Sequence, residues 1–396
     1  MLSPYRALLA RAGARRLALS CGLGWLSFSG YSLAIVLAAH AASGSFAAAG
    51  AAVAGFSAGS GLFAPVRGRL VDRAGPTALS YLALAHATAA ALLIFACATT
   101  HSAALLIGGA AIAGAVVPPL IATARAVWTR IAGPELVTTA HALNAALGDG
   151  AQILSPAFVG AVAALVSPTV GLAFLVTGAA VAAALVGSGH RDGSPRTRRV
   201  SGHRIGAVLL ESSGLRTVVI CDLSLGLWLG ALEVAVTAVA AGSGSPELAS
   251  VPFSLSAVGS IAASLWAGSR RSSRQPRARY VAGCVLIAAV LPFALLDPTI
   301  PAITVVLVIA SAGYGLLSVA LFELIDHVVA PDRAVEAFTW LTTWQGVGIA
   351  AGAAAAGQLA QSGPSRALAL AAIAPLPAAV TAIARRRTLQ AGPTGH

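Results

Sequence analysis

The arginines of this chain are concentrated in every second gap between its apolar stretches. Twelve long apolar stretches run through its 396 residues, and 24 of the 25 arginines fall in alternate gaps between these stretches. The other set of gaps holds only Arg366. Loops rich in positive charge resist translocation and stay on the cytoplasmic side of a bilayer, whereas a water-soluble protein has no reason to sort its arginines in this way. The pattern predicts a multi-pass membrane protein with one fixed orientation.

Each apolar stretch is long enough to cross a bilayer, which takes roughly 20 residues of helix. We therefore expect an all-α membrane protein with twelve transmembrane helices. An even number of crossings returns the chain to its starting side, so both termini are expected in the cytoplasm, where the terminal arginines require them. The expected spans are 17–39, 46–66, 77–97, 102–124, 137–165, 168–187, 217–241, 247–268, 280–296, 300–323, 335–359 and 366–384.

The composition agrees with a bilayer as the solvent. Apolar residues make up 57% of the chain and charged residues only 10%, against about 25% in soluble domains. The net charge of +12 lies beside the apolar spans and faces lipid headgroups, so nucleic acid is not an expected partner. There is no lysine, which excludes a P-loop ATPase. The four cysteines lack the spacing of a zinc site, and neither a metal nor another cofactor is expected.

One long polar segment, 189–216, divides the apolar stretches six and six. It is expected to be a cytoplasmic linker between an N-terminal six-helix bundle, 1–188, and a C-terminal six-helix bundle with a basic tail, 217–396. Features recur at an offset of about 200 residues, since Gly68 and Gly268 close the second helix of each half. The two halves are therefore expected to be internal repeats.

The gap after the second apolar stretch carries the sequence GRLVDRAG. Its Gly68, Asp72, Arg73 and Gly75 have the spacing and the place of the loop signature of the major facilitator superfamily, which the chain resembles over essentially its whole length. The resemblance implies two six-helix bundles that rock about a central site and carry a small molecule across the lipid bilayer.

In that family the loop bridges the halves and stabilises the outward-facing state. The resemblance therefore implies a conformational latch formed by Asp72, Arg73 and Arg125, with Glu336 as a partner in the other half. Asp72 can also face the positive end of a helix dipole. The sequence departs from the family pattern at Pro76 and Thr77, where the family usually has basic residues, so a weaker latch is expected.

The fifth apolar stretch contains GDGAQILSPAFVG. Its Ser155, Pro156 and Gly160 resemble the Gly-Pro stretch found in proton-driven efflux members, although Ser155 stands where the first glycine of that pair would be. A proline in a membrane helix frees a carbonyl group and bends the helix. The match favours efflux over import, and plain helix packing explains these residues almost as well.

Three acidic residues fall inside apolar stretches away from their ends, where an ionised side chain costs about 2.5–3.5 kcal/mol on insertion scales. They are Asp149 in the fifth stretch, and Asp222 and Glu233 in the seventh. Each is a candidate to carry coupling protons. Glu233 is also a candidate for binding a cationic substrate, and Asp222 for a gate that pairs with Arg216. The alternative is that the acid pairs with a hydroxyl, amide or arginine side chain and only orients the bundle.

Polar and aromatic residues at cavity depth are candidates for binding the substrate through stacking, hydrogen bonds and cation–π attraction. Taken singly, each aromatic residue in a membrane helix more often packs or lies at the interface. The candidates are Trp25, Tyr31, Gln152, Trp228, Tyr314, Trp340 and Trp344.

Two patterns typical of enzymes occur in unsuitable places. Gly55 to Gly59 reads G-x-S-x-G around Ser57, but this hydrolase motif needs a strand, turn and helix, and here it lies within an apolar stretch. Asp149 with Asp222 would be the pair of an intramembrane aspartyl protease, without the expected aromatic neighbour. We expect no enzyme.

Together these features predict a monomeric secondary transporter of the cell (inner) membrane. The expected function is proton-coupled efflux of a small hydrophobic or amphipathic compound, as in drug resistance. The alternative is uptake or facilitated passage of a small polar nutrient, such as a sugar, amino acid or organic ion. A remote alternative is an intramembrane hydrolase.

Overall fold

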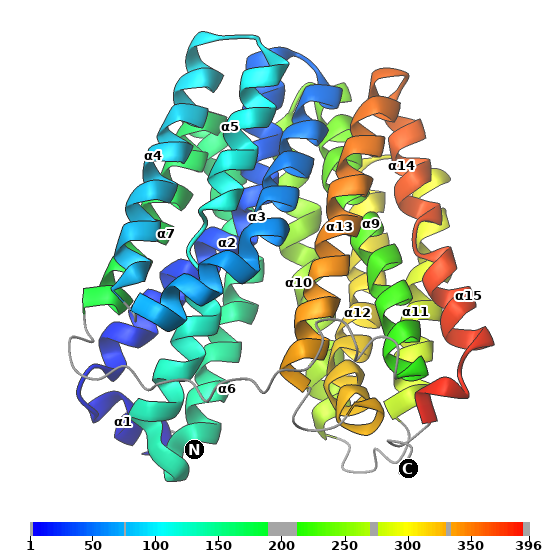
Figure 1. Cartoon of the computed structure of the whole chain (residues 1–396). Helices are drawn as coiled ribbons and strands as arrows, with labels where there is room; N and C mark the ends of the chain where they lie inside the picture. Colours follow the sequence, from blue (N-terminus) through cyan, green and yellow to red (C-terminus); the bar gives the residue numbers. More distant parts are fainter. Residues whose placement is uncertain (1–2, 75–76, 189–211, 270–275, 330–333, 391–396) are drawn as a thin grey trace.

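The computed structural model describes residues 3–74, 77–188, 212–269, 276–329 and 334–390. All elements in these ranges are helices, and they stand side by side in two groups (Figure 1). The first group contains α1 (Ser3–Ala10), α2 (Ala14–Ser43), α3 (Phe46–Ala74), α4 (Ala78–Thr99), α5 (Ala103–Ala115), α6 (Leu120–Leu165) and α7 (Pro168–Ser188). The second contains α9 (Ser213–Gly242), η1 (Pro246–Ala249), α10 (Ser250–Ser269), α11 (Pro276–Val290), η2 (Leu291–Leu295), α12 (Ile300–Val328), α13 (Ala334–Gln361), α14 (Pro364–Ile373), α15 (Leu376–Ala384) and η4 (Thr388–Gln390).

The helices have the length and surface of membrane spans, which confirms the predicted all-α membrane class. Ten helical segments in the described residues are long and apolar enough to cross a bilayer. Large apolar side chains such as Phe95, Leu165 and Leu296 are exposed on the outside, where a bilayer would cover them. Helices α5 and α13 lie at the fourth and eleventh predicted spans, and the count of twelve crossings stays a prediction.

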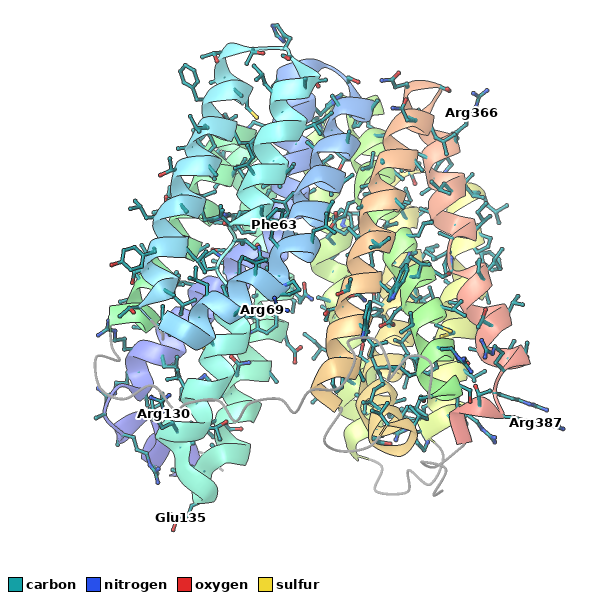
Figure 2. The ribbon with its side chains drawn as sticks, viewed as in Figure 1. Phe63, Arg69, Arg130, Glu135, Arg366 and Arg387 are labelled. Atoms are coloured by element: carbon teal, nitrogen blue, oxygen red, sulfur yellow. The ribbon has the colours of Figure 1, made fainter. Side chains whose placement is uncertain are left out.

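Charged side chains mark the two ends of the molecule. Arg130, Glu135 and Arg387 lie at the end that carries α1, and Arg366 lies at the opposite end (Figure 2). Arg11, which follows α1, connects this end of the chain to α6. Its guanidinium group donates hydrogen bonds to two backbone carbonyl groups of α6 just before the turn at Gly133. This distribution agrees with the parity of the arginines, while the side of the membrane on which each end lies stays a prediction.

The fourth predicted span is not one helix, so the expectation of an unbroken helix over 102–124 is wrong. Helix α5 ends at Ala115 and α6 begins at Leu120. Pro118 and Pro119 lie in the gap, and a proline has no N–H group to donate and clashes with a preceding helical turn. Helix α6 then runs on through the fifth predicted span, with a turn at Gly133, whose φ of 60° favours glycine.

A buried arginine donates hydrogen bonds to carbonyl groups at the end of α5, beside this break. Arg67 of α3 is 6% exposed, and its NH1 atom donates hydrogen bonds to the carbonyl oxygens of Gly114 (2.6 Å) and Ala115 (3.2 Å). Its NH2 atom donates to the carbonyl oxygen of Ser60 at 2.6 Å. Within a bilayer every backbone polar group needs a partner in the protein, and a cation at a helix C-terminus is favourable. Arg67 thus caps α5.

Helices α9 and α13 approach each other closely through glycines on both sides. A Cβ atom at any of these positions would collide with the backbone of the facing helix, so only glycine permits this distance. The glycines are Gly226 and Gly230 of α9 and Gly348 and Gly352 of α13. This contact fixes the rotation of α9, the helix that carries Asp222 and Glu233.

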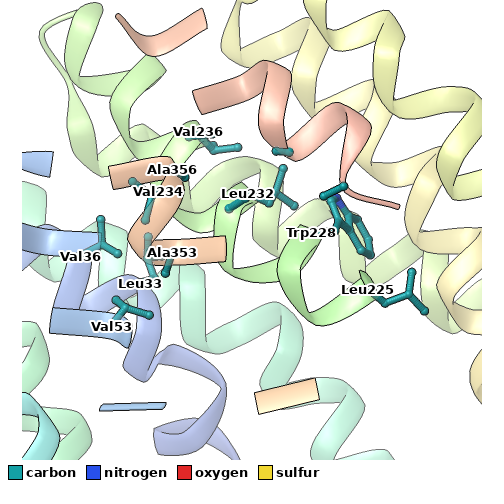
Figure 3. Close-up of a cluster of buried hydrophobic side chains, with 14 of the residues drawn as sticks. Leu33, Val36, Val53, Leu225, Trp228, Leu232, Val234, Val236, Ala353 and Ala356 are labelled. Atoms are coloured by element: carbon teal, nitrogen blue, oxygen red, sulfur yellow. The ribbon is translucent and has the colours of Figure 1, made fainter. Parts of the chain in front are cut away.

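The two groups of helices are sealed against each other at the end remote from α1. Gly50 of α3 lies against the backbone of Ala353 in α13, and Gln361 donates a hydrogen bond to Ser45 at 2.8 Å. Below these contacts, α2, α3, α9 and α13 share a continuous apolar core (Figure 3). The labelled residues of this core include Leu33, Val36, Val53, Val234, Ala353 and Ala356.

We predict that Arg67→Met destabilises the protein, because it removes the side-chain donor of the Ala115 carbonyl group and the 2.6 Å hydrogen bond to the Gly114 carbonyl group. Each buried group without a partner costs about 1–3 kcal/mol, which would lower the Tm of the purified protein in detergent. The matched control is Arg69→Met, two residues away, because Arg69 is exposed. Equal Tm values for the two variants would contradict the capping role.

Candidate functional site

A cavity of about 310 Å³ lies between the two groups of helices. Its wall is formed by α2 and α6 of the first group and by α9, α10 and α12 of the second. It extends from Leu33 and Leu232, next to the sealed core, to Ser264 and Ser318, nearer the end that carries α1. A solute in this cavity would contact both groups of helices at once.

One acidic residue from each group of helices lines the cavity. Asp149 of α6 is exposed, and Glu233 of α9 is partly buried. Ser32 of α2 is a hydrogen-bonding neighbour of the Glu233 carboxyl group, whose Oε2 atom is buried and has no hydrogen-bond partner among the described residues. A buried polar atom without a partner costs free energy, so this oxygen is available to a proton or to a donor on a solute.

Hydroxyl groups line the part of the cavity wall that α10 and α12 form. Ser256, Ser260 and Ser264 recur at every fourth residue of α10, which places them on one helical face. Ser311, Tyr314 and Ser318 of α12 also line the cavity. The three serines of α10 were missed by the sequence analysis, although their spacing of four in an apolar helix was a visible signal.

Three further predicted residues lie in the lining of the cavity. Gln152 follows Asp149 by one helical turn on α6. Trp228 and Tyr314 lie side by side, with ring centroids 6.3 Å apart and planes inclined at 54°. The cavity therefore has an aromatic side, to which Phe253 also belongs.

The other predicted aromatic residues lie outside this lining. Trp25 packs against Gly148, and its Nε1 atom is 3.4 Å from the Asn144 Oδ1 atom. Trp340 and Trp344 are partly buried against the apolar core of the second group. These three tryptophans join helices to one another in this structure.

Tyr31 faces the interior of the first group of helices. Its hydroxyl oxygen is 2.7 Å from the Nε2 atom of His86, whose Nδ1 atom is 3.0 Å from the carbonyl oxygen of Ala113. Because a carbonyl group only accepts, Nδ1 carries the proton, and in a neutral His86 the Tyr31 hydroxyl donates to Nε2. Tyr31 and Arg67 line a second cavity of about 210 Å³, separate from the first.

Asp222 is buried outside the cavity lining, near the lining residue Tyr314. It is 4% exposed, and its electrostatic neighbours are Tyr280, Cys284 and the cavity residue Tyr314. The predicted pairing of Asp222 with Arg216 is wrong, since the structure has no ion pair between these two described residues. Six residues separate them on α9, which turns their side chains roughly 120° apart, and Arg216 points outward.

The serine, proline and glycine predicted to bend the fifth helix have three different environments. The Ser155 hydroxyl donates to the carbonyl oxygen of Leu26 at 2.5 Å, which ties α6 to α2. Pro156 lines the cavity, and Gly160 lies against Ser250 of the second group. Among the described residues of α6, only Gly133 leaves helical dihedral angles, so a bend at Pro156 stays a prediction.

The predicted latch lies largely outside what the structure describes. Gly68 is within α3, with no neighbouring atom near the position of a Cβ. Asp72 and Arg73 are within α3 and Arg125 is within α6, but the placement of their side chains is not described, and Gly75 is outside the described ranges. The side chain of Glu336 in α13 is likewise outside. The latch stays a prediction, as does the linker, of which 189–211 is outside the described ranges.

Comparison with known proteins identifies a family. The family model of the Major Facilitator Superfamily matches residues 17–353. No curated protein sequence matches the chain. The fold is similar to that of the nucleoside transporter NupG, with a TM-score of 0.73 at 15% identity, covering 94% of this chain and 98% of that one.

Two further solved structures have a similar fold. A bacterial homologue of the iron transporter ferroportin, in an inward-facing state, has a TM-score of 0.73 at 14% identity, over 94% of this chain and 98% of that one. A bacterial homologue of the human lysosomal transporter Spinster, also inward-facing, has a TM-score of 0.67 at 14% identity, over 95% of this chain and 94% of that one. At these identities the likeness establishes the fold alone.

We predict that a cysteine introduced by Ser264→Cys reacts with a membrane-impermeant maleimide from the side that carries α1, because Ser264 lines the open part of the cavity. The four native cysteines are buried, so the background reaction is expected to be low. The matched control is Ser254→Cys on the same helix, since Ser254 is 8% exposed and outside the lining. The measurement is mass-tag labelling in inside-out vesicles and in whole cells. Labelling of Ser264→Cys from the opposite side only, or no faster than the control, would contradict this placement.

Proposed function

Since the chain belongs to the Major Facilitator Superfamily, a family of membrane transporters, we propose that it is a proton-coupled exporter of a small compound. The observation that carries this proposal is the pair Asp149 and Glu233, one acid from each group of helices, on the wall of a single cavity. Rocking of the two groups about this cavity would expose both carboxyl groups to one side of the membrane and then to the other.

Each carboxyl group is proposed to exchange protons with the water that enters the cavity. A proton bound from one side and released to the other moves charge across the membrane, which links transport to the membrane potential. The unpartnered Oε2 atom of Glu233 supports this role, because protonation would remove the cost of a buried charge. Asp222, one layer behind Tyr314, is a third candidate for the same role.

The direction of transport and the type of cargo are proposed from separate features. Ser155, Pro156 and Gly160 resemble part of the signature of proton-driven efflux members, as noted above. The cavity combines an apolar side, including Leu33, with a polar side, which suits an amphipathic compound better than a purely hydrophobic one. In the predicted orientation, the contacts of Gly50 with Ala353 and of Gln361 with Ser45 lie at the outer end, and the end that carries α1, from which an exporter would take its cargo, faces the cytoplasm.

Uptake or facilitated passage of a small polar nutrient is the second candidate. The hydroxyl groups that line α10 and α12 favour it, because they can bind a polar solute. The structurally similar NupG is a nucleoside transporter, which also supports this candidate.

The proposed location is the cell (inner) membrane, with both termini in the cytoplasm. The proposed functional unit is a monomer.

The remote alternative of an intramembrane hydrolase is excluded, because the family and the similar solved structures are those of transporters. The G-x-S-x-G sequence around Ser57 lies within the continuous helix α3. Gly55 and Gly59 bring α3 close to Ile107 and Ala111 of α5, which explains these glycines as helix packing.

We predict that Asp149→Asn and Glu233→Gln each reduce proton-driven accumulation in inside-out vesicles to the level of vesicles without the protein. An amide side chain keeps the size of the carboxyl group but cannot carry the exchanged proton. The cargo for the assay is a compound to which a deletion strain becomes hypersensitive in a screen of toxic amphipathic compounds.

The matched control for these two variants is Asp297→Asn, because Asp297 is an exposed acid between η2 and α12 and lies outside the cavity. Its transport should equal that of the unaltered protein. Accumulation that persists unchanged in both single variants and in the double variant would contradict a coupling role for this pair of acids.

A further inference from the structure

The cavity wall is rich in hydrogen-bond acceptors and holds no cation among the described residues. Asp149 and Glu233 contribute carboxyl groups, which in the ionised state only accept hydrogen bonds. The chain has no lysine, and no arginine or histidine in the described ranges belongs to the lining. Both carboxylates therefore face the cavity without a counter-ion from the wall.

The serine hydroxyls of α10 strengthen this bias toward acceptors. The Ser256 hydroxyl donates its proton to the carbonyl oxygen of Phe253 at 2.8 Å, and the Ser264 hydroxyl donates to the carbonyl oxygen of Gly315 at 3.3 Å. A hydroxyl group has one proton and two lone pairs. With its proton directed at the backbone, each of these oxygens presents lone pairs, and so an acceptor, to the cavity.

The aromatic side of the cavity is suited to a positive charge. Trp228 and Tyr314 line the same cavity as Glu233, Asp222 is an electrostatic neighbour of Tyr314, and the faces of such rings attract ammonium groups. A cavity that contains both aromatic rings and carboxylates favours a cation in two ways, through the ring quadrupole and through the full negative charge.

We propose that the cargo is a small protonated amine that carries further hydroxyl or N–H donors. Its ammonium group binds at Glu233 beside the aromatic side, and its other donors bind the serine oxygens of α10. An anion would be repelled by the two carboxylates, and a donor-free solute would leave the hydroxyl lone pairs and Oε2 of Glu233 without partners. The volume of about 310 Å³ lies at the lower end of the range for small-molecule pockets, which limits the cargo to a compact solute.

This inference rests on the proposed function only in taking the cavity as the transport site, and equilibrium binding tests it without a proton gradient. The probes are two hydroxylated amines, glucosamine and 2-deoxystreptamine, with their neutral counterparts glucose and myo-inositol. Glucuronate is the anionic probe and tetraethylammonium the cation without donors. Calorimetry on the purified full-length protein should give at least roughly tenfold tighter binding for the amines than for every other probe, about 1.4 kcal/mol.

Binding of a neutral, anionic or donor-free probe as tightly as the amines would overturn the inference. The inference would also be overturned if neither amine bound at about 100 mM, because a Kd above this concentration is weaker than that of any useful transport site. A protein that binds amines but moves no protons contradicts the proposed function alone. A protein that couples protons to a different solute contradicts this inference alone.

Two variants locate the binding in the cavity. Glu233→Gln should abolish the preference for amines over their neutral counterparts, because it removes the charge. Ser256→Ala should weaken amine binding by roughly threefold to tenfold, the effect of one hydrogen bond. The matched control is Ser254→Ala on the same helix, which should bind as the unaltered protein does, since Ser254 is outside the lining. Equal affinities for Ser256→Ala and Ser254→Ala, with unchanged Tm values, would overturn the placement.

Discussion

The fold depends on one constraint, which is that a backbone polar group in hydrocarbon must find its partner within the protein. Helices meet this constraint locally, and the break between α5 and α6 shows what happens where they cannot. Pro118 and Pro119 end the helical hydrogen bonding, and Arg67 and His86 supply the missing donors from two neighbouring helices. A guanidinium group inside the membrane, which would otherwise be costly, is stabilised by the carbonyl groups that it satisfies.

Much of the fold could be predicted because the bilayer imposes simple rules on the sequence. Arginine parity and stretch length are properties of segments, and they gave the helical class and the approximate place of each span. The break at Pro118 escaped prediction, although prolines were visible there, because membrane helices tolerate proline when other groups satisfy the freed carbonyls. Whether Arg67 did so depended on contacts between helices far apart in the sequence.

The site was only partly predictable, because a residue type does not reveal the rotation of its helix. Asp222 and Glu233 were candidates for the same role, yet only Glu233 lines the cavity. A separation of eleven residues places their side chains within about 20° of each other around α9, so they differ in depth along the helix, and Asp222 is buried with Tyr280 and Tyr314 as its electrostatic neighbours. Tyr31 likewise bonds to His86, whose position on α4 no pattern within α2 could indicate.

The proposed proton coupling and the proposed selection of a cationic cargo would have a common physical origin in this cavity. A carboxylate next to a protonated amine is neutralised by the amine, and an empty carboxylate at the same place is neutralised by a proton. Proton and amine therefore compete for Glu233, since either one removes the cost of its buried charge. If only the neutralised site permits the two groups of helices to rock, the empty carboxylate cannot return without a cation. A proton gradient would then favour return with a proton, which would give the proposed exchange of amine for proton, and the serine oxygens of α10 would add selectivity for donors that a proton does not need.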